Sequence, residues 1–529
     1  MVTSREWPSA GSPRKKGLPS FIFFAVLGSL QLLIDTVPPA SCLEPRDVVF
    51  VVMSQGDSYN AGQAHNLKDD ILLQAQKFQQ PSPVVHLFHE DFPHPGAWTI
   101  LPIITKLYTL HGVNSSWVLF LESRTRVNLP VLLSELAELG AEGAEPEASR
   151  SKQGKKAKGK GERGKWVGHA LRDREPTIIH HFQSDGRLSY PHFSAGFAID
   201  RVLLHILSDR VEEWAASGEV SDFSIDAAHE LASFIWNSGQ GAHLTHSKAF
   251  CLTLDQNKTE SHARCATWPL RFEPCGEPES PDAVYFAVKT CSKFHKARLP
   301  VVKRTWAQYA VHITYFSDTE DPSIPSVNLG IPNTEHGHCA KTKGILQHVS
   351  KEIKSERLKN IKWAVLVDDD TILSVARLLS LLSCFQREDK KPVVLGERYG
   401  YRVSEPMEEE FPSYSYGYNY ATGGGGVVLN VEAIHTLSES DVCVCPSPDA
   451  PDDMVLLGVC LSRLGISVTH SPSFHQARPL DYPAKFLKPQ HPVSFHKHWM
   501  IDPVNVYQEW FAASDQEIKL DKASIHNEL

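Results

Sequence analysis

Short apolar runs alternate with amphipathic stretches along most of this 529-residue chain. Residues 48–52, 117–121, 284–288 and 363–367 are almost entirely apolar, and polar residues follow each of them. Runs of this length, separated by segments with helical periodicity, are typical of a mostly parallel sheet covered by helices. The pattern therefore predicts an α/β fold.

The apolar runs also come in two similar sets. Residues 48–52 resemble 284–288, residues 117–125 resemble 363–371, and residues 194–199 resemble 424–429, at nearly equal spacings along the chain. Repetition on this scale indicates two copies of one α/β domain rather than chance similarity between strands. We expect a first domain over residues 45–250 and a second over residues 282–515.

Three consecutive carboxylates end one of these runs, at Asp368, Asp369 and Asp370. Carboxylates placed so closely repel one another, and a bound divalent cation is the usual remedy. Oxygen ligands suit Mg²⁺ or Mn²⁺, and the carboxyl ends of strands in an α/β sheet are where ligands bind. This pattern predicts a metal site that holds a diphosphate, with a solvated acidic turn as the alternative.

The first copy differs at this position, where Glu122, Ser123 and Arg124 stand in place of the aspartates. Since an arginine replaces a metal ligand, we expect a non-catalytic first domain. It could hold the protein substrate or only buttress the second domain. Residues 140–165 are low in apolar residues and predict a disordered insertion. Residues 251–281 carry cysteines and read as a disulfide-stapled linker whose pairing stays open.

Further clusters in the second copy could complete a site. Gly424 and Gly425 precede an apolar run and would let the backbone approach a ligand closely. Asp452 and Asp453 open a predicted helix at residues 455–464, with Asp452 expected as its cap and Asp453 as a general base. Imidazole groups can join carboxylates in binding a transition metal, and the candidates are His475, His496 and His498.

The ends of the chain and its sequons indicate a secretory address. Basic residues 14–16 precede a largely apolar run at 18–34, so residues 1–42 predict either a cleaved signal peptide or a signal-anchor. Asn114 and Asn257 lie in glycosylation sequons, and ten cysteines suit an oxidising lumen. The tail, residues 516–529, ends in a tetrapeptide close to endoplasmic reticulum return signals, formed by His526, Asn527, Glu528 and Leu529.

These features predict a resident of the endoplasmic reticulum lumen, either soluble or single-pass type II, that a retention receptor recognises. Contact with a membrane is expected only through the N-terminal segment. The net charge of −9 is spread along the chain, which argues against nucleic acid as a partner.

In their order and residue types, these motifs resemble those of the fringe-like inverting β-1,3-glycosyltransferases. The resemblance covers nearly the whole chain after the N-terminal segment and includes the acidic triplet, the glycine run, residues 451–453 and residues 471–475. It implies two tandem GT-A-like (Rossmann-related) domains, the first degenerate and the second catalytic. It further implies UDP-glucose as donor, Mn²⁺ as metal with Mg²⁺ as an alternative, and O-linked fucose on folded thrombospondin type 1 repeat proteins as acceptor.

By matching positions, the resemblance implies that Asp370 binds the metal and that Asp453 is the catalytic base. It implies that the donor is bound by Asp368, Asp369, Gly424, Gly425, Glu397 and Arg398. Ala477 stands where the family has a second histidine. His475 and His496 therefore both remain candidates for the remaining metal ligand.

Two alternatives stay open. Donor choice depends on the shape of the pocket, so a sister β-1,3-galactosyl- or N-acetylglucosaminyltransferase fits the same motifs. A non-catalytic, lectin-like folding chaperone is the alternative from another class. The intact Asp368–Asp370 triplet and Asp453 argue against it, because the first copy shows what a disused site looks like.

Overall fold

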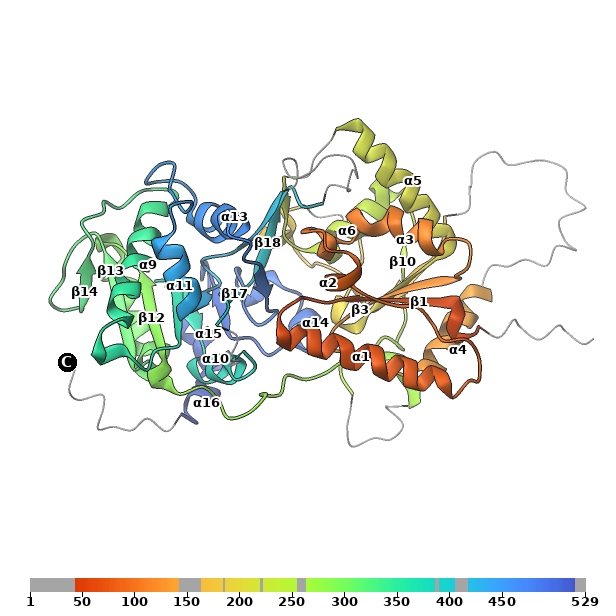
Figure 1. Cartoon of the computed structure of the whole chain (residues 1–529), viewed down its shortest axis with the longest axis horizontal. Coiled ribbons are helices and arrows are strands. Elements are labelled where there is room, and N and C mark those ends of the chain that lie inside the picture. Colours follow the sequence, from red (N-terminus) through yellow and green to blue (C-terminus); the bar gives the residue numbers. More distant parts are fainter. Residues whose placement is uncertain are drawn as a thin grey trace, which may run out of the picture. The chain divides into compact units, whose positions relative to one another are not determined.

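The computed structural model describes residues 43–141, 163–183, 186–218, 222–254, 263–385, 390–404 and 417–518 (Figure 1). The predicted signal segment, most of the insertion, Asn257 and the C-terminal tetrapeptide lie outside the described residues. Within the described ranges, the helices are too short or too polar to cross a membrane.

The first half of the chain is built on a mixed sheet of order β10-β5-β8-β3-β1-β2. β1 is parallel to β2 and β3, whereas β8 runs antiparallel to both of its neighbours, β3 and β5. The strands are β1 (Val48–Met53), β2 (Val85–Leu87), β3 (Trp117–Glu122), β5 (Trp166–Gly168), β8 (Phe197–Asp200) and β10 (Leu244–His246).

Helices cover both faces of this first sheet. On one face the apolar core is shared with α3 (Ile104–His111), α5 (Arg201–Ser217) and α6 (Ala227–Trp236). The other face packs against α1 (Ser58–Gln76) and α4 (Leu129–Ala141). The buried residues of α1 recur every three to four positions, as an amphipathic helix requires, and the Asp57 side chain caps its first turn. Because helices bury both faces, β1 and β3 are apolar along almost their whole length.

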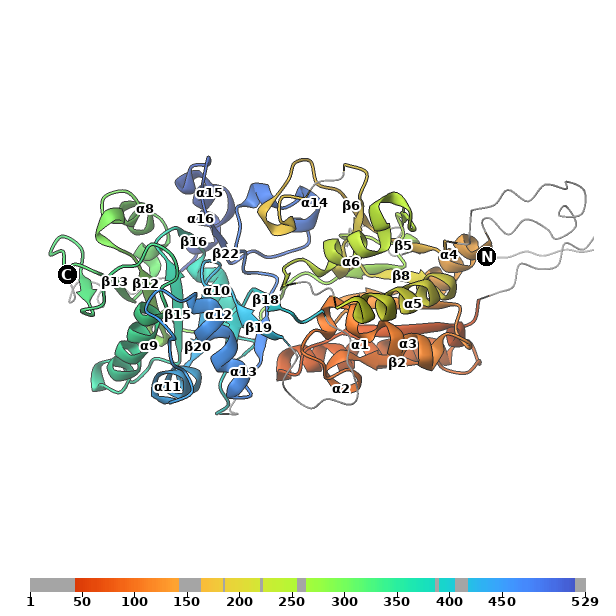
Figure 2. The same cartoon turned by 90° about the horizontal axis from the view of Figure 1, so that it is seen from above.

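The second half contains a sheet of order β14-β13-β12-β15-β20-β17-β21. Its strands are β12 (Val284–Lys289), β13 (His312–Ser317), β14 (Ser326–Asn328), β15 (Trp363–Asp368), β17 (Val394–Gly396), β20 (Val427–Asn430) and β21 (Val468–His470). Figure 2 shows α9 (Cys339–Ile353) and α11 (Val431–Glu439) on one side of this sheet, and α8 (Leu299–Arg304) and α15 (Pro503–Trp510) on the other.

The two sheets share strand order, direction and register. β12, β15 and β20 pair with one another as β1, β3 and β8 do, and β17 and β21 repeat the pairing of β5 and β10. Val48 lies opposite Trp117 in the first sheet, as Val284 lies opposite Trp363 in the second. The predicted α/β class is confirmed, whereas the domain boundaries stay predictions.

Smaller elements position the functional side chains. The segment after the aspartates forms β16 (Thr371–Leu373), and Ser374 then caps α10 (Val375–Leu382). β16 pairs with β22 (Ser494–His496), which places His496 opposite Thr371. The helix predicted at residues 455–464 is present, as the π-helical stretch η12 (Val455–Cys460) and α13 (Leu461–Arg463), after α12 (Asp452–Met454).

The predicted disulfides are present. Cys251–Cys265 closes a short loop within the linker segment, and Cys275–Cys384 ties that segment to the end of α10. Cys339–Cys445 and Cys443–Cys460 brace the helical side of the second half. The two halves also share a small sheet, in which β9 (Phe223–Ser224) pairs with β18 (Arg398–Tyr401), and β18 pairs with β19 (Tyr418–Ala421).

Candidate active site

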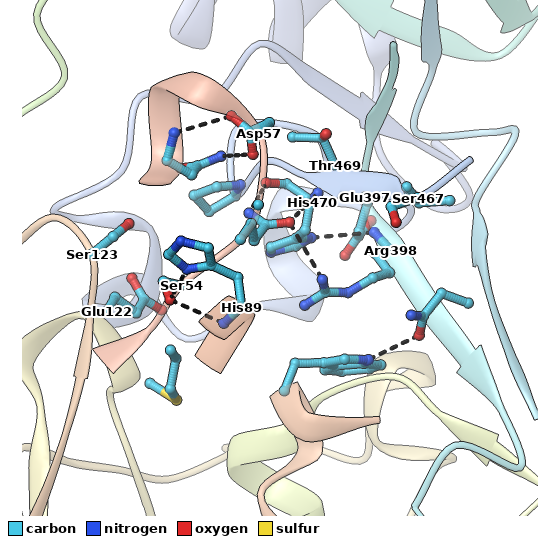
Figure 3. Close-up of a pocket in the computed structure, with 18 of the residues that line it drawn as sticks. Ser54, Asp57, His89, Glu122, Ser123, Glu397, Arg398, Ser467, Thr469 and His470 are labelled. Atoms are coloured by element: carbon cyan, nitrogen blue, oxygen red, sulfur yellow. Dashed lines mark hydrogen bonds between the residues drawn. The ribbon is translucent and has the colours of Figure 1, made fainter. Parts of the chain in front are cut away.

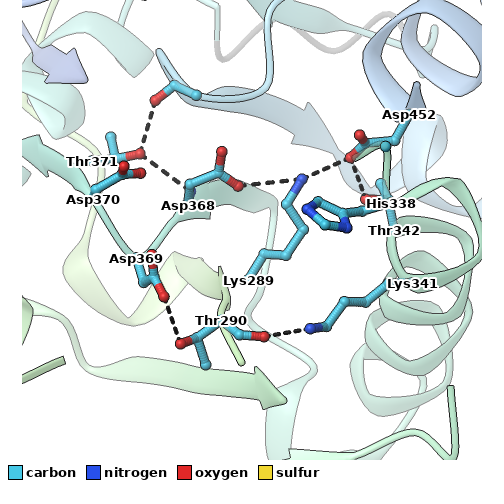
Figure 4. Close-up of polar contacts among 12 residues, drawn as sticks. Lys289, Thr290, His338, Lys341, Thr342, Asp368, Asp369, Asp370, Thr371 and Asp452 are labelled. Atoms are coloured by element: carbon cyan, nitrogen blue, oxygen red, sulfur yellow. Dashed lines mark hydrogen bonds and ion pairs between the residues drawn. The ribbon is translucent and has the colours of Figure 1, made fainter. Parts of the chain in front are cut away.

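The acidic triplet lies at the carboxyl end of β15, next to Lys289 at the end of β12 (Figure 4). Lys289 Nζ is 3.2 Å from Asp368 Oδ1 and 2.7 Å from Asp452 Oδ2. Thr342 Oγ1 donates a second hydrogen bond, of 2.5 Å, to the same Asp452 oxygen. Burial would lower the pKa of Lys289, but these two carboxylates raise it above its usual range. The lysine is therefore a fixed cation between the triplet and α12.

Asp369 points away from this lysine and into the protein. Its carboxylate accepts hydrogen bonds from Thr290 Oγ1 (2.7 Å) and Arg298 Nη1 (2.8 Å). Arg298 Nη1 is also 3.0 Å from Asp370 Oδ2, so one guanidinium holds both carboxylates. Burial raises the pKa of Asp369, and the two hydrogen bonds oppose that shift. Asp369 thus positions its neighbours, and its predicted contact with the donor stays a prediction.

Asp368, Asp370 and His496 form a group whose ligand atoms all lie within 4.8 Å of one another. His496 Nε2 is 3.0 Å from Asp370 Oδ1 and 3.7 Å from Asp368 Oδ2. The other ring nitrogen, Nδ1, donates to the Gln476 carbonyl oxygen at 3.1 Å, which aims Nε2 at the carboxylates. Metal-binding histidines are commonly oriented in this way. Two carboxylates and one oriented imidazole fit Mn²⁺, and the chemistry of this set is compatible with Mg²⁺.

The charges within this group are coupled. Burial raises the pKa of Asp370, but the hydrogen bond and the charge of His496 bring it down to about 2. The same contact raises the pKa of His496, against the effect of its burial. Asp370 is therefore ionised throughout the physiological range, as a metal ligand must be.

Gly424 is the residue that makes room for the His496 ring. A Cβ atom at this position would lie 2.3 Å from His496 Cε1 and 2.4 Å from Nδ1. The N–H of Gly425 donates to Gln476 Oε1 at 2.6 Å, and Gln476 in turn orients the ring. Both glycines thus support the histidine, and their predicted contact with the donor stays a prediction.

His475 does not join the group. Its Nδ1 donates to the Ser494 carbonyl oxygen at 3.1 Å, and its Nε2 is hydrogen-bonded to the Gln490 side-chain amide at 2.8 Å. The ring is buried and stacked on Phe495, and burial lowers its pKa to about 4. With both nitrogens engaged, His475 is not available to the aspartates, and His496 is the candidate that joins their group. His498, the third candidate, lies near Asp370, whose charge opposes the burial that lowers the pKa of His498 to about 4, but it is not part of this group.

Asp453 lies beside the same network, at the start of α12. Burial and the charge of Asp452 raise the pKa of Asp453, which suits a group that accepts a proton. The expectation that Asp452 caps the helix is wrong, because Pro451 occupies the N-cap position and Asp452 binds Lys289 and Thr342 instead. A buried lysine offers the carboxylate a stronger partner than a helix end does.

Glu397 and Arg398 lie further along the same edge of the sheet. Glu397 Oε2 accepts a short hydrogen bond from the Gln476 N–H, so it supports the residue that orients His496. Arg398 Nη1 donates to Gln55 Oε1 at 3.3 Å, and its guanidinium lies 4.7 Å from the centre of the Trp98 ring. Neither side chain contacts the aspartates in the described structure, and a donor-binding role for them stays a prediction.

The equivalent edge of the first sheet keeps the backbone hydrogen bonds of the second but lacks its charged and metal-binding side chains. Thr125 Oγ1 bonds the Glu122 N–H and the Ser194 carbonyl oxygen, just as Thr371 bonds Asp368 and Gly424. By strand register, however, Met53 replaces Lys289 and Pro269 replaces His496. The substitutions thus extend beyond Glu122, Ser123 and Arg124, the three that the sequence indicated.

Several residues of the site were missed from sequence alone, namely Lys289, Thr290, Arg298, Thr342 and Gln476. Lys289 and Thr290 carried a usable signal, since polar residues at the carboxyl end of a buried strand are well placed to reach a ligand. Arg298, Thr342 and Gln476 had none, because only tertiary packing brings them to the aspartates. Asn114 is exposed after α3, and its glycosylation stays a prediction.

Comparison with known proteins shows similarity to glycosyltransferases. A family model described as fringe-like matches residues 279–520. A β-1,3-glucosyltransferase of Mus musculus is 43% identical over 497 residues, covering 93% of this chain and 92% of the relative. Its Homo sapiens namesake is 43% identical over 480 residues, covering 90% and 87%. Manic fringe of Danio rerio, a β-1,3-N-acetylglucosaminyltransferase, is 30% identical over 208 residues, covering 36% and 55%.

Proposed function

The chain belongs to the fringe-like β-1,3-glycosyltransferases, and from this premise we propose that it transfers glucose from UDP-glucose to O-linked fucose on folded thrombospondin type 1 repeats. The observation that carries the proposal is the group of Asp368, Asp370 and His496 beside Asp453. The glucosyl donor is supported by the glucosyltransferase relatives, whose similarity extends through both halves of the chain.

Asp368, Asp370 and His496 would hold Mn²⁺. When bound, the ion supplies positive charge that offsets the charge growing on the diphosphate leaving group. The protein's own part is to fix the ligands. Arg298 holds the Asp370 carboxylate, and Gln476 holds the His496 ring. Both contacts reduce the reorganisation that binding of the donor would otherwise require.

Asp453 would act as the general base. It accepts the proton of the fucose 3-hydroxyl while that oxygen attacks the anomeric carbon of glucose, and UDP departs with the electron pair of the broken bond. Attack opposite the leaving group inverts the anomeric centre, so an α-linked donor gives a β linkage. The raised pKa of Asp453 makes it a better proton acceptor than an ordinary exposed aspartate.

A donor panel tests the proposal. The purified chain would be incubated with Mn²⁺, a fucosylated repeat and either UDP-glucose, UDP-galactose or UDP-N-acetylglucosamine, with the product read by intact mass. We expect a gain of one hexose with UDP-glucose, abolished by a chelator. Transfer of N-acetylglucosamine instead would favour the activity of the fringe relative. A folded chain that binds the repeat but transfers no sugar would point to a chaperone.

The proposed site of action is the lumen of the endoplasmic reticulum. The apolar N-terminal run, the sequons, the C-terminal tetrapeptide and the disulfides support it. A retention receptor is the proposed partner of the tetrapeptide. Microscopy of a chain tagged upstream of residue 526 tests this, because removal of residues 526–529 should let the protein leave the endoplasmic reticulum.

A further inference from the structure

A large cleft lies where the carboxyl edge of the first sheet meets the ends of β17 and β21 (Figure 3). Its volume is about 1680 Å³. Sites for a single small molecule usually measure about 300–1,000 Å³, so this cleft has room for more than one sugar. It includes the disused edge at Glu122, Ser123 and Arg124, and on the opposite side Arg398 and His470.

Arg398 is a half-buried cation that has no carboxylate partner among the described residues. Its guanidinium makes one long hydrogen bond, to Gln55 Oε1, and stacks on Trp98. Its Nε–H is buried and has no hydrogen-bond acceptor in the described structure. Burial, uncompensated by any neighbouring carboxylate, lowers the pKa of Arg398 to about 9. By contrast, Arg298 and Arg478 each lie within 3.0 Å of a carboxylate oxygen.

An isolated buried charge is costly, and an incoming anion would relieve that cost. The adjacent Glu397 does not supply the missing charge. Its carboxyl group faces the Gln476 N–H, and burial raises its pKa to about 8, which disfavours its charged form. Among the described residues, no negative charge therefore accompanies the Arg398 guanidinium, and an anionic group of a ligand would supply one.

The guanidinium is held in a defined position. Gln55 bridges to the second half by pairing with the backbone of His470, through hydrogen bonds of 2.9 and 2.7 Å. Trp98 lies under the guanidinium and is fixed by a 2.9 Å hydrogen bond from its Nε1 to Asn419 Oδ1. A planar guanidinium fixed in this way can present two N–H groups to one carboxylate.

The cleft reaches β19, and this strand packs against α12, the helix that carries Asp453. Tyr418 and Asn419, at the start of β19, line the cleft. Tyr420 lies two residues further along the same strand. Burial raises the pKa of Tyr420, and the charge of Asp453, the proposed base, adds to that shift. A polypeptide lying in the cleft could therefore present a glycan to Asp453 without leaving the surface of β19.

We propose that this cleft binds the polypeptide part of the acceptor glycoprotein, and that Arg398 pairs with a carboxylate side chain of that polypeptide. The inference rests on the proposed function and assigns to the first half a share in holding the acceptor. It also removes Arg398 from the donor site.

Calorimetric binding of a folded, fucosylated thrombospondin type 1 repeat tests the inference. Arg398→Gln should raise the Kd for the repeat at least 10-fold, because the bound carboxylate would lose its partner. The Kd for UDP, measured with Mn²⁺, should not change. Arg402→Gln is the matched control. Arg402 lies at the end of the same hairpin in an exposed ion pair with Asp222, outside the cleft, and its loss should leave both constants unchanged.

The outcomes separate this inference from the proposed function. A repeat that binds Arg398→Gln as tightly as the unaltered chain would overturn the inference alone, and weakened UDP binding would return Arg398 to the donor site. Failure of the unaltered chain to bind the repeat would remove the proposed acceptor as well. Should Arg398→Gln not fold, Arg398→Lys decides. It keeps the charge and loses the paired N–H groups, so repeat binding should weaken several-fold with UDP binding intact.

Discussion

Gly424→Ala should damage the metal site without touching a metal ligand. The added methyl group would lie 2.3 Å from His496 Cε1 and 2.6 Å from Nε2. The ring cannot easily move aside, because its side chain is only 6% exposed and Nδ1 is hydrogen-bonded to Gln476. Ordinary van der Waals contact begins at 3.4 Å, so the ring must shift by about 1 Å.

The size of the effect follows from this shift. Metal–ligand distances tolerate deviations of about 0.2 Å, and a displacement of about 1 Å removes His496 as an effective ligand. Loss of a group that merely orients a ligand already costs about 10- to 100-fold in metal affinity. We therefore expect Mn²⁺ affinity to fall by at least about 10- to 100-fold. Overpacking at a buried site should also lower the free energy of unfolding by about 1–3 kcal/mol.

The assay is a Mn²⁺ titration of the purified chain, followed by the paramagnetic resonance of free Mn²⁺ and, separately, by the rate of transfer. Gly423→Ala is the matched control, since a Cβ atom at this neighbouring glycine would have open space around it. It should bind Mn²⁺ like the unaltered chain. Equal metal affinity in the two alanine variants would refute the assignment of His496 as a ligand.

The remaining predictions concern the base, a buried histidine and a disulfide. Asp453→Asn should lower kcat by about 10²- to 10⁴-fold, with the Kd for UDP and the unfolding temperature unchanged, and near-normal transfer would exclude Asp453 as base. Burial lowers the pKa of His180, but the hydrogen bonds that its ring donates to Asp173 and Asp226 raise it to about 9. Its stabilisation should be complete below about pH 6.5 and disappear towards pH 9. His180→Gln should remove that part of the decline in unfolding temperature, and an unchanged pH profile would contradict it. Replacing the cysteines of Cys275–Cys384, which are 109 residues apart, should lower the free energy of unfolding in urea by about 1–2 kcal/mol more than replacing those of Cys251–Cys265, which are 14 residues apart. Equal losses would show that loop closure is not the origin of the effect.

The sequence by itself was sufficient for the α/β class and for the location of the acidic triplet. Strands buried on both faces must be apolar, and carboxylates at the end of such a strand are conspicuous against it. Repetition of these runs also indicated that the two halves share a topology, because apolar runs in the same order predict strands in the same order. The strands and the triplet are local signals that about ten residues contain, and the repetition needs only a comparison of such local runs along the chain.

Only the tertiary structure decided which side chains meet at the site. His475 and His496 were equivalent candidates in the sequence, and the pairing of β22 with β16 brought His496 to Asp370. Asp452 resembled a helix cap until Lys289, from a strand far away in the sequence, provided a stronger partner. Arg398 followed the motif of a donor site but faces the first half of the chain. Contacts between distant segments depend on strand register and packing, which no local pattern specifies.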